Sequence, residues 1–361
     1  MNSKELILLT EFEKFINASA SGKRLTASGK RITNGVIQNY QFTQKLLEEY
    51  EQHYSVTLRI VLLNKASLTI LQKEKKYWMK FYIQFSSFLY KQKKYFDNYV
   101  SGTFKNIKTF FNYLITEKAY PIGQFHKLFR VPQKQFSPIV LTPEQLNYLI
   151  TDNDFYNRLN PTLKKIRDIL IVGCTLGLRI SDLMRLKSTH IIKAGTVSYI
   201  SIHTKKTGTA IKIPIPDYVT TVFDKYKKKN NNFLLPQYAK ANINKYLKQL
   251  AEEAGWTFTI PKNMCRQGKI IEVLNKQGKC YRFCDHITAH TMRRTAITTL
   301  LILGVPELVV RNLSGHAPGS KEFYKYIAIA NEYSNTQIMQ AQNKLINFSR
   351  TEHQNEGIRL L

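Results

Sequence analysis

The chain has 361 residues, of which 54 are Lys or Arg and 25 are Asp or Glu, so its formal net charge is +29. A hydrophobic fraction of 43% is typical of a folded protein and excludes a disordered basic tail. A folded chain this basic, with cations spread over both halves, favours a polyanionic partner, most often nucleic acid. A charge that serves only solubility is the alternative, and the apolar content disfavours a ribosomal type of protein.

We expect neither a signal peptide nor a membrane span. Glu5 precedes a short apolar run, and no apolar stretch approaches the roughly 20 residues that a membrane helix needs. Four cysteines are too few for a disulfide framework. These features predict a soluble, reduced, cytoplasmic protein.

Apolar residues at helical spacing predict that residues 1–135 are all-helical. In residues 1–60, two helical stretches, 6–16 and 37–50, flank a small, polar and basic segment, 17–31. This segment is either a strap that lies on phosphates or a plain surface loop, and charge alone does not separate the two.

Two aromatic stripes predict two further helices, at residues 78–89 and 104–114. Such stripes are buried core far more often than platforms for base stacking. Lys105 and Lys108 lie on the opposite, wet face of the second helix, so they are candidate DNA contacts.

A basic linker with prolines leads to a helix start at Thr142, where Gln145 completes a capping box. Beyond this boundary the pattern is mixed. It predicts helices at 166–174 and 180–186, strands at 197–203 and 211–215, a second hairpin at 270–283 around Gln277-Gly278, and helices from 290 to about 348. The predicted fold is an all-helical N-terminal region followed by a mainly helical domain with a small antiparallel β-sheet.

Several common catalytic motifs are missing. The chain has no P-loop, no G-x-G-x-x-G and no H-E-x-x-H sequence, so nothing indicates nucleotide hydrolysis, dinucleotide binding or a zincin site. Cys265, Cys280, Cys284 and His286 fit no standard zinc spacing, and we interpret them as core or surface residues. We expect no metal and no cofactor.

The remaining candidates are phosphate-binding side chains and tyrosines, each of which alone has an ordinary interpretation as a helix-end, turn or loop residue. In chain order they are Arg179, Lys206, His290, Arg293, His316, Tyr324 and Tyr326. Their contexts change this interpretation, because five short motifs occur in one order.

These motifs resemble those of the tyrosine recombinase, or phage integrase, family. Residues 175–183 (TLGLRISDL) resemble the family's first arginine motif, and 290–294 (HTMRR) its His-x-x-Arg motif. Residues 313–316 (LSGH) resemble its Gly-His motif, 323–327 (FYKYI) its nucleophile segment, and 204–208 (TKKTG) the hairpin that carries its lysine. The resemblance is close over residues 138–348 and also fits the helical region before them.

The resemblance implies a site-specific recombinase that cuts and rejoins DNA through a covalent 3′-phosphotyrosine, without metal or ATP. Arg179 and Arg293 would fork onto the scissile phosphate, because a guanidinium keeps its charge and its two donors. His290 and His316 would donate hydrogen bonds or move a proton. Lys206 would protonate the departing 5′-oxygen. Asp182 would orient Arg179, and Lys205 and Arg294 are further candidate DNA contacts.

The nucleophile is Tyr324 or Tyr326, which lie eight and ten residues after His316, whereas the family usually has nine. Alignment of FYKYI on the family's hydrophobic-x-x-Tyr-Ile pattern favours Tyr326.

By the same resemblance, residues 61–135 would be the helical core-binding domain and 138–350 the catalytic domain. Residues 1–60 would be an arm-type DNA-binding extension and 351–361 a C-terminal tail. Double-stranded DNA is the expected partner, bound by a homotetramer on synapsed sites with an accessory bending or directionality factor, at the nucleoid.

An integrase or excisionase of a mobile element or phage is the expected role. The alternatives are a DNA invertase, a chromosome-dimer resolvase, a topoisomerase of the same chemistry, and a non-catalytic DNA-binding protein on the same scaffold.

Overall fold

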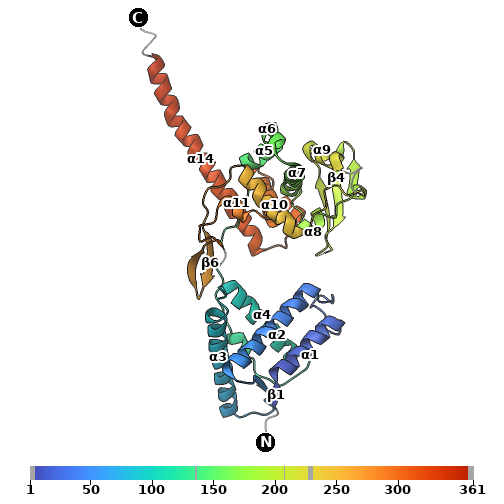
Figure 1. Ribbon diagram of the computed structural model, residues 1–361, viewed down its shortest axis with the longest axis vertical. Coiled ribbons are helices and arrows are strands. Elements are labelled where there is room, and N and C mark those ends of the chain that lie inside the picture. The colour runs from blue at the N-terminus through green and yellow to red at the C-terminus, as the bar shows by residue number, and fades with distance from the viewer. Residues whose placement is uncertain (1–4, 135, 207, 227–230, 357–361) are drawn as a thin grey trace. The chain divides into compact units, whose positions relative to one another are not determined.

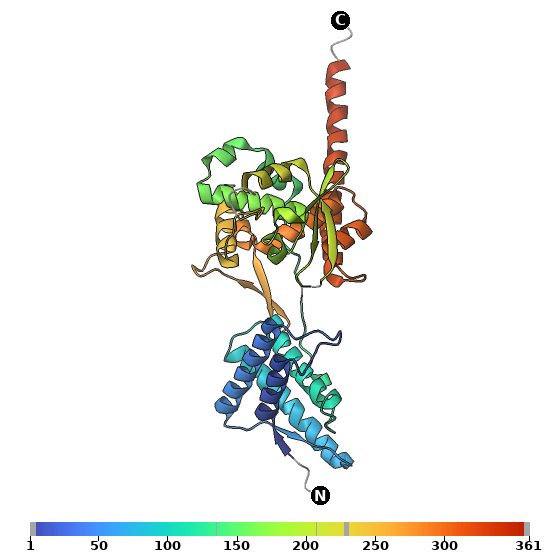
Figure 2. The same ribbon diagram turned by 90° about the vertical axis from the view of Figure 1, so that its right-hand side faces the viewer.

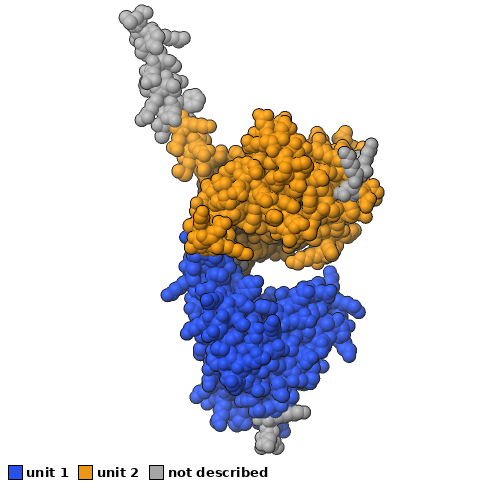
Figure 3. All heavy atoms as spheres, in the orientation of Figure 1, with its two compact units in different colours: residues 1–135, 262–273 blue, residues 136–261, 274–361 orange. Residues whose placement is uncertain are grey.

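The computed structural model describes residues 5–134, 136–206, 208–226 and 231–356. The chain divides into two compact units: unit 1 comprises residues 1–135 and 262–273, and unit 2 comprises residues 136–261 and 274–361 (Figure 3). Helices dominate both units, and the sheets are small and antiparallel (Figure 1). The predicted fold class is therefore confirmed.

Unit 1 is built on four long helices and one short pair of strands. Its elements are β1 (Glu5–Ile7), α1 (Leu8–Ser21), α2 (Asn34–Tyr54), β2 (Arg59–Val61), α3 (Leu68–Lys91), α4 (Asp97–Thr116) and the 3₁₀ turn η1 (Phe125–Leu128). The β1–β2 pair is antiparallel and adds a small sheet to a region expected to be all-helical. All four helices predicted from the spacing of apolar residues are present.

The core of unit 1 is aromatic, as the two stripes predict. Phe85 and Phe104 from the stripes pack edge to face at 5.7 Å, and both are buried. Phe15 of α1 lies 4.7 Å from Tyr40 of α2 and belongs to the same cluster of buried residues. Residues 1–60 therefore share a core with the rest of unit 1 and form no separate compact unit.

The basic segment 17–31 is tied to the protein at Arg24. The guanidinium of this residue lies 4.7 Å from the ring centre of Phe15 and donates to Glu117 Oε1 at 3.1 Å. Its side chain is only 12% exposed. Of the two interpretations of this segment, the surface loop is the better description at Arg24, because this cation is already bound.

A β-hairpin from the second half of the sequence belongs to unit 1. Strands β6 (Lys262–Arg266) and β7 (Lys269–Val273) pair antiparallel across a two-residue turn. Asp97, which is 1% exposed, accepts the backbone N–H groups of Gln267 and Gly268 at 2.7 and 2.9 Å. The hairpin is therefore fastened to the first residue of α4.

The position predicted for this hairpin, around Gln277-Gly278, is wrong. Gln267 and Gly268 have φ of 53° and 77°, the left-handed values that a tight hairpin turn requires. Residues 275–279 instead form a turn in which the Asn275 carboxamide accepts the N–H groups of Gln277 and Lys279. Both segments carry Gly after Gln, so the dipeptide alone does not select the hairpin.

Unit 2 is mainly helical, with the three-stranded antiparallel sheet β3–β4–β5. Its elements are α5 (Pro143–Thr151), α6 (Asn153–Arg158), α7 (Pro161–Leu176), α8 (Ile180–Leu183), η2 (Ser188–His190), β3 (Ile191–Ala194), β4 (Val197–His203), β5 (Ala210–Pro214), α9 (Asp217–Tyr226), α10 (Lys240–Glu253), α11 (Phe283–His286), α12 (Ala289–Ile302), α13 (Glu307–Ser314) and α14 (Lys321–Glu356). The capping box at Thr142 is present, as predicted.

Helices α7 and α12 pack closely at the centre of unit 2. A Cβ atom on Gly173 would lie 2.3 Å from Met292 Sδ, so glycine permits this approach. Both helices contribute to the main core cluster of the unit. This packing fixes α12, which carries two of the candidate residues.

Helix α14 begins against the body of unit 2 and then extends away from it (Figures 1 and 2). Tyr333 donates a hydrogen bond to Glu144 at the start of α5. Beyond it, Ile338 and Met339 are 54% and 64% exposed. In the described part of the chain, no helix is long and apolar enough to cross a membrane.

Candidate active site

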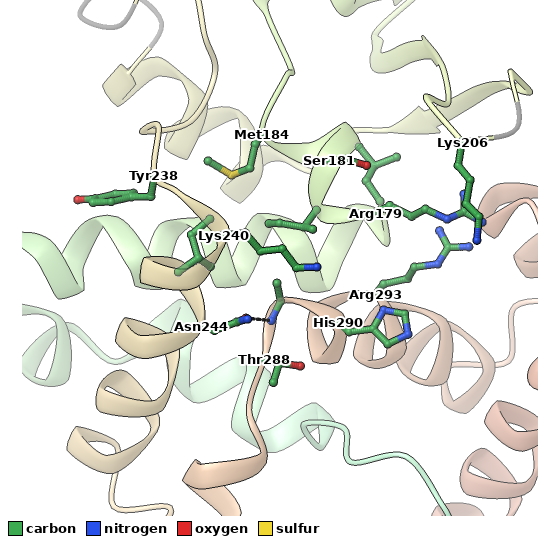
Figure 4. Close-up of a pocket in the computed structure, with 14 residues that line it drawn as sticks. Arg179, Ser181, Met184, Lys206, Tyr238, Lys240, Asn244, Thr288, His290 and Arg293 are labelled. Atoms are coloured by element: carbon green, nitrogen blue, oxygen red, sulfur yellow. Dashed lines mark hydrogen bonds between the residues drawn. The ribbon is translucent and has the colours of Figure 1, made fainter. Parts of the chain in front are cut away.

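A pocket of about 800 Å³ in unit 2 is lined by four of the predicted residues, Arg179, Lys206, His290 and Arg293. They come from three places in the sequence: the start of α8, the loop after β4, and the first turns of α12. Figure 4 shows these side chains gathered at one side of the pocket. The structure thus brings together groups that are up to 114 residues apart in the chain.

The conformation of Gly177 sets the position of Arg179. Helix α7 ends at Leu176 and is capped by Gly177, whose φ of 63° is left-handed. The chain then turns into α8 with Arg179 at its N-cap. A Cβ on Gly177 would also lie 3.2 Å from Ala296 of α12. Glycine at position 177 therefore allows the segment that carries Arg179 to lie close to α12, the helix that carries Arg293.

Arg293 is held by backbone oxygens and by no carboxylate within ion-pair distance in the described residues. One Nη donates to the Gly177 carbonyl at 2.9 Å and the other to the Ser314 carbonyl. The side chain is 5% exposed. Burial and the neighbouring Arg179 lower its pKa to about 10, so the guanidinium stays charged at neutral pH.

Asp182 holds the loop that presents Lys206. Its Oδ1 accepts the backbone N–H of Lys205 at 2.8 Å and Nε of Arg185 at 3.1 Å, and Arg185 also donates to the His203 carbonyl. Asp182 is fully buried. From the sequence we expect this carboxylate to orient Arg179, whereas in the structure it contacts the β4–β5 loop and Arg185.

The surroundings of the two histidines favour the neutral imidazole, because they lower both pKa values. Burial, followed by the charges of Arg294 and Arg293, lowers the pKa of His290. Burial and the two pocket arginines lower the pKa of His316 to about 4. His316 Nδ1 is 2.8 Å from Ser314 Oγ, and these two residues flank Gly315, the left-handed residue that ends α13.

Tyr326 and Tyr324 have opposite environments. Tyr326 is 4% exposed, and its ring centre lies 6.0 Å from that of His316. Burial raises its pKa, while the adjacent Arg294 and Arg293 lower it. Tyr324 is 53% exposed. Among the two candidate nucleophiles, Tyr326 is the one beside the arginines and His316.

The predicted DNA contacts are distributed over both units. Lys105 and Lys108 lie on α4, the first exposed and the second half-buried, where burial and Arg130 lower the pKa of Lys108. Lys205 is exposed next to Lys206. Arg294 is half-buried and adjoins Tyr326.

The cysteines do not assemble a metal site in the described part of the chain. Cys265 lies on the hairpin of unit 1, whereas Cys280 and Cys284 belong to unit 2. His286 has another partner, because its Nε2 donates to the Ile260 carbonyl at 2.9 Å. No group of three or more His, Cys, Asp or Glu among the described residues could hold a metal ion.

The sequence interpretation missed Lys240 and Asn244, two polar residues of α10 that line the pocket. No motif marks them, and Asn244 meets its partner, Ala289, across 45 positions of sequence. Only the packing of α10 on α12 reveals them.

The model of the phage integrase family matches residues 140–332, more than half of the chain. Solved structures of low identity share the fold. A lambda integrase dimer bound to a COC′ core site has 14% identity and a TM-score of 0.57, over 90% of this chain and 77% of that one. The Tn1549 transposon integrase with circular intermediate DNA has 16% identity and a TM-score of 0.54, over 89% of this chain and 95% of that one. XerH recombinase bound to palindromic difH has 12% identity and a TM-score of 0.55, over 92% of this chain and 95% of that one.

A comparison with curated protein sequences found no match. The family model covers the sequence from just before α5 to the first third of α14, which includes every motif on which the resemblance depends. The chain therefore belongs to the phage integrase family and is a tyrosine site-specific recombinase.

Proposed function

We propose that this recombinase cuts DNA with Tyr326 and holds the cut strand as a 3′-phosphotyrosine. The observation that supports it most is the convergence of separate motifs on one pocket, with a buried tyrosine beside the same arginines. The residues of the site would be Arg179, Lys206, His290, Arg293, His316 and Tyr326.

The arginines would stabilise the transition state. Attack on a phosphodiester increases negative charge on the non-bridging oxygens, which preorganised donors stabilise. In the described part of the chain, neither Arg179 nor Arg293 forms an ion pair, so both charges are available to the phosphate. Backbone carbonyls fix Arg293 without neutralising it.

The proton transfers follow from the chemistry of the neighbours. The Tyr326 oxygen forms a bond to phosphorus as the bond from phosphorus to the 5′-oxygen breaks. His290, whose lowered pKa favours the neutral ring, takes the phenol proton. Lys206 gives a proton to the 5′-oxygen. The reverse sequence rejoins the strands, so the energy of the broken bond is retained and no ATP is consumed.

Double-stranded DNA would be the substrate of both units. A net charge of +29 predicts that log affinity falls steeply with log salt concentration, with a slope steeper than about −5. A titration of binding against salt measures this slope. A flat response would remove DNA as the partner.

A homotetramer on synapsed sites would perform the reaction. The exposed apolar residues Ile338 and Met339 on the projecting part of α14 are suited to burial against a neighbouring copy. Charged replacements there, such as Ile338→Glu, should leave single-site DNA binding intact and abolish recombination. Light scattering of the complex with DNA would show loss of the higher assembly.

The test of the nucleophile uses a nicked suicide substrate and two matched variants. Tyr326→Phe removes one oxygen and keeps the ring, so folding and DNA binding should persist while the covalent adduct disappears. Tyr324→Phe should keep the adduct, because that residue is exposed and Tyr326 is the one beside the arginines. Peptide mapping of the trapped adduct should find Tyr326 joined to a 3′-phosphate, and the released fragment of the same cleaved strand should carry a free 5′-hydroxyl.

The outcomes separate the alternatives. An adduct on Tyr324 would transfer the role to that residue, and an adduct on neither would favour a non-catalytic DNA-binding protein. Adduct formation should persist in EDTA, and a requirement for Mg²⁺ would contradict the mechanism. Relaxation of supercoiled DNA without site preference would favour a topoisomerase.

The finer role that we propose is integration or excision of a mobile element or phage. Sequencing the DNA ends trapped on the protein from host genomic DNA decides it. Ends at element boundaries would support this role, ends that flank an invertible segment would indicate an invertase, and one chromosomal site would indicate a resolvase. The same experiment, repeated with host extract, would show whether an accessory factor is required.

A further inference from the structure

The catalytic pocket has a second polar wall, opposite the predicted residues and formed by α10. Lys240 and Asn244 are four residues apart and therefore lie on one face of this helix. Both line the pocket, and Figure 4 shows Lys240 extending from α10 toward the side where His290 and Arg293 lie. The proposed chemistry uses neither residue.

Asn244 fastens this wall to the helix of the second arginine. Its Oδ1 accepts the backbone N–H of Ala289 at 2.9 Å. Ala289 is the first residue of α12, where the N–H groups have no partner within the helix. The contact therefore sets the position of α10, and with it Lys240, relative to His290 and Arg293.

Lys240 carries an uncompensated charge at this position. In the described part of the chain no carboxylate lies within ion-pair distance of it, and its side chain is exposed. Its charge reaches the site, because it contributes to the lowered pKa of His290 after burial and the two arginines of α12. Lys240 thus lines the same pocket as Arg179, Lys206 and Arg293, and a bound anion would lower the repulsion among these four cations.

The size of the pocket indicates which anion this is. A volume of about 800 Å³ exceeds what one phosphate group needs, and a DNA strand carries a phosphate at about every 3.4 Å of helix axis. A strand whose scissile phosphate sits on the arginines must therefore continue past one of the pocket walls. Among the described residues, α10 contributes Lys240 as a further cation on the wall away from the arginines.

We propose that Lys240 binds the backbone phosphate next to the scissile phosphate and so fixes the strand for attack by the tyrosine. This inference rests on the proposed function. Lys240 is a positioning residue in it: it contacts the substrate away from the reacting atoms and takes no part in proton transfer.

The test is a cycle between a protein variant and a substrate analogue. Lys240→Ala removes the charge, Lys240→Arg retains it, and Lys245→Ala is the matched control, an exposed lysine on α10 that does not line the pocket. The substrates are suicide duplexes in which one phosphate at a time is replaced by an uncharged methylphosphonate. Single-turnover adduct formation is measured for each combination, and thermal melting confirms that each variant is folded.

We expect Lys240→Ala to slow adduct formation about tenfold, as for loss of one charge-assisted contact. A methylphosphonate at one position next to the scissile phosphate should slow the unmodified protein equally and should slow Lys240→Ala no further. Lys240→Arg should restore most of the rate, and Lys245→Ala should behave as the unmodified protein at every position.

Other outcomes would overturn the inference. If Lys240→Ala and each methylphosphonate act independently at all positions, Lys240 contacts no neighbouring phosphate. If the variant only shifts the pH profile of cleavage upward, Lys240 acts through His290 and the phosphate contact is refuted. In both cases an adduct with the unmodified protein leaves the proposed function intact, whereas no adduct with the unmodified protein would overturn both.

Discussion

Arg293 in the pocket and Arg24 in unit 1 are both largely buried arginines of a very basic chain, but their partners differ. Arg24 stacks on Phe15 and pairs with the carboxylate of Glu117. Arg293 donates to two backbone carbonyls and, in the described part of the chain, has no carboxylate in contact.

This difference distinguishes a structural cation from one that is kept for a substrate. A carboxylate partner neutralises a guanidinium, whereas a carbonyl orients it and leaves its full charge. The same contrast extends to Arg59 and Lys93 of unit 1, which pair with Glu74 and Glu49. Net charge alone does not reveal which cations are available to bind a substrate. The identity of the hydrogen-bond acceptor of each cation does reveal it.

The largest expected effect is on catalysis. Arg293→Ala should lower the rate of adduct formation by about a hundredfold to a thousandfold, because its charge acts on the transition state. Duplex affinity should change far less, since many other cations contact DNA. Rate and affinity are measured per folded molecule, with Arg293→Lys as the variant that keeps the charge. An equal loss in both quantities would make Arg293 a DNA-positioning residue.

The second effect is on stability against acid and concerns His126 of unit 1. Burial lowers the pKa of His126 to about 4. Its Nε2 donates a hydrogen bond to Asn112 Oδ1 at 2.9 Å. Because the folded pKa is lowered, the neutral ring gives stability that is complete above pH 6.5 and is lost as the pH falls to about 4. The loss is about 3 kcal/mol at most.

His126→Gln keeps an amide next to Asn112 and removes the titration. Its free energy of unfolding, measured by urea denaturation, should therefore decline less between pH 7 and pH 4 than that of the unmodified protein. Parallel declines would show that His126 does not cause the acid sensitivity.

The third effect is on stability alone. Arg24→Ala should destabilise the protein by about 1 kcal/mol, through loss of the contact with Phe15 and of a partly exposed ion pair. Adduct formation per folded molecule should not change. A reduced rate without a change in stability would place Arg24 on DNA and revive the phosphate-strap interpretation of its segment.

The smallest effect is on binding. Lys105→Ala and Lys108→Ala should each weaken duplex affinity modestly and reduce the salt slope by about one unit. Lys75→Ala is a suitable control, because this exposed lysine of α3 is not assigned to DNA. Slopes identical to that of the unmodified protein would remove both lysines from the interface.

Local patterns were enough to predict the helices but not every turn. The stripes at 78–89 and 104–114 occur in α3 and α4, because helical periodicity reports burial directly. The second hairpin was misplaced, because Gln267-Gly268 and Gln277-Gly278 offer the same residues. The contact that selects the first is with Asp97, 170 positions away.

The site was predictable where a motif carries it and not where packing does. Arg179, Lys206, His290 and Arg293 line one pocket, as their order in the resemblance implies. The partner of Asp182, the backbone N–H of Lys205, was not predictable from the sequence. It lies on the β4–β5 loop, and only the folded structure brings that loop to the carboxylate. The roles of these residues remain predictions for the experiments above.

The hairpin on Asp97 also affects how this protein could be cut or recombined with others. The chain passes between its two units three times, at residues 135–136, 261–262 and 273–274. A fragment that ends at residue 135 would leave the Asp97 carboxylate without two of its N–H donors, and the complementary fragment would carry a hairpin without its acceptor. Exchange of the N-terminal part for that of a relative must therefore include residues 262–273, because the structural unit is discontinuous in the sequence.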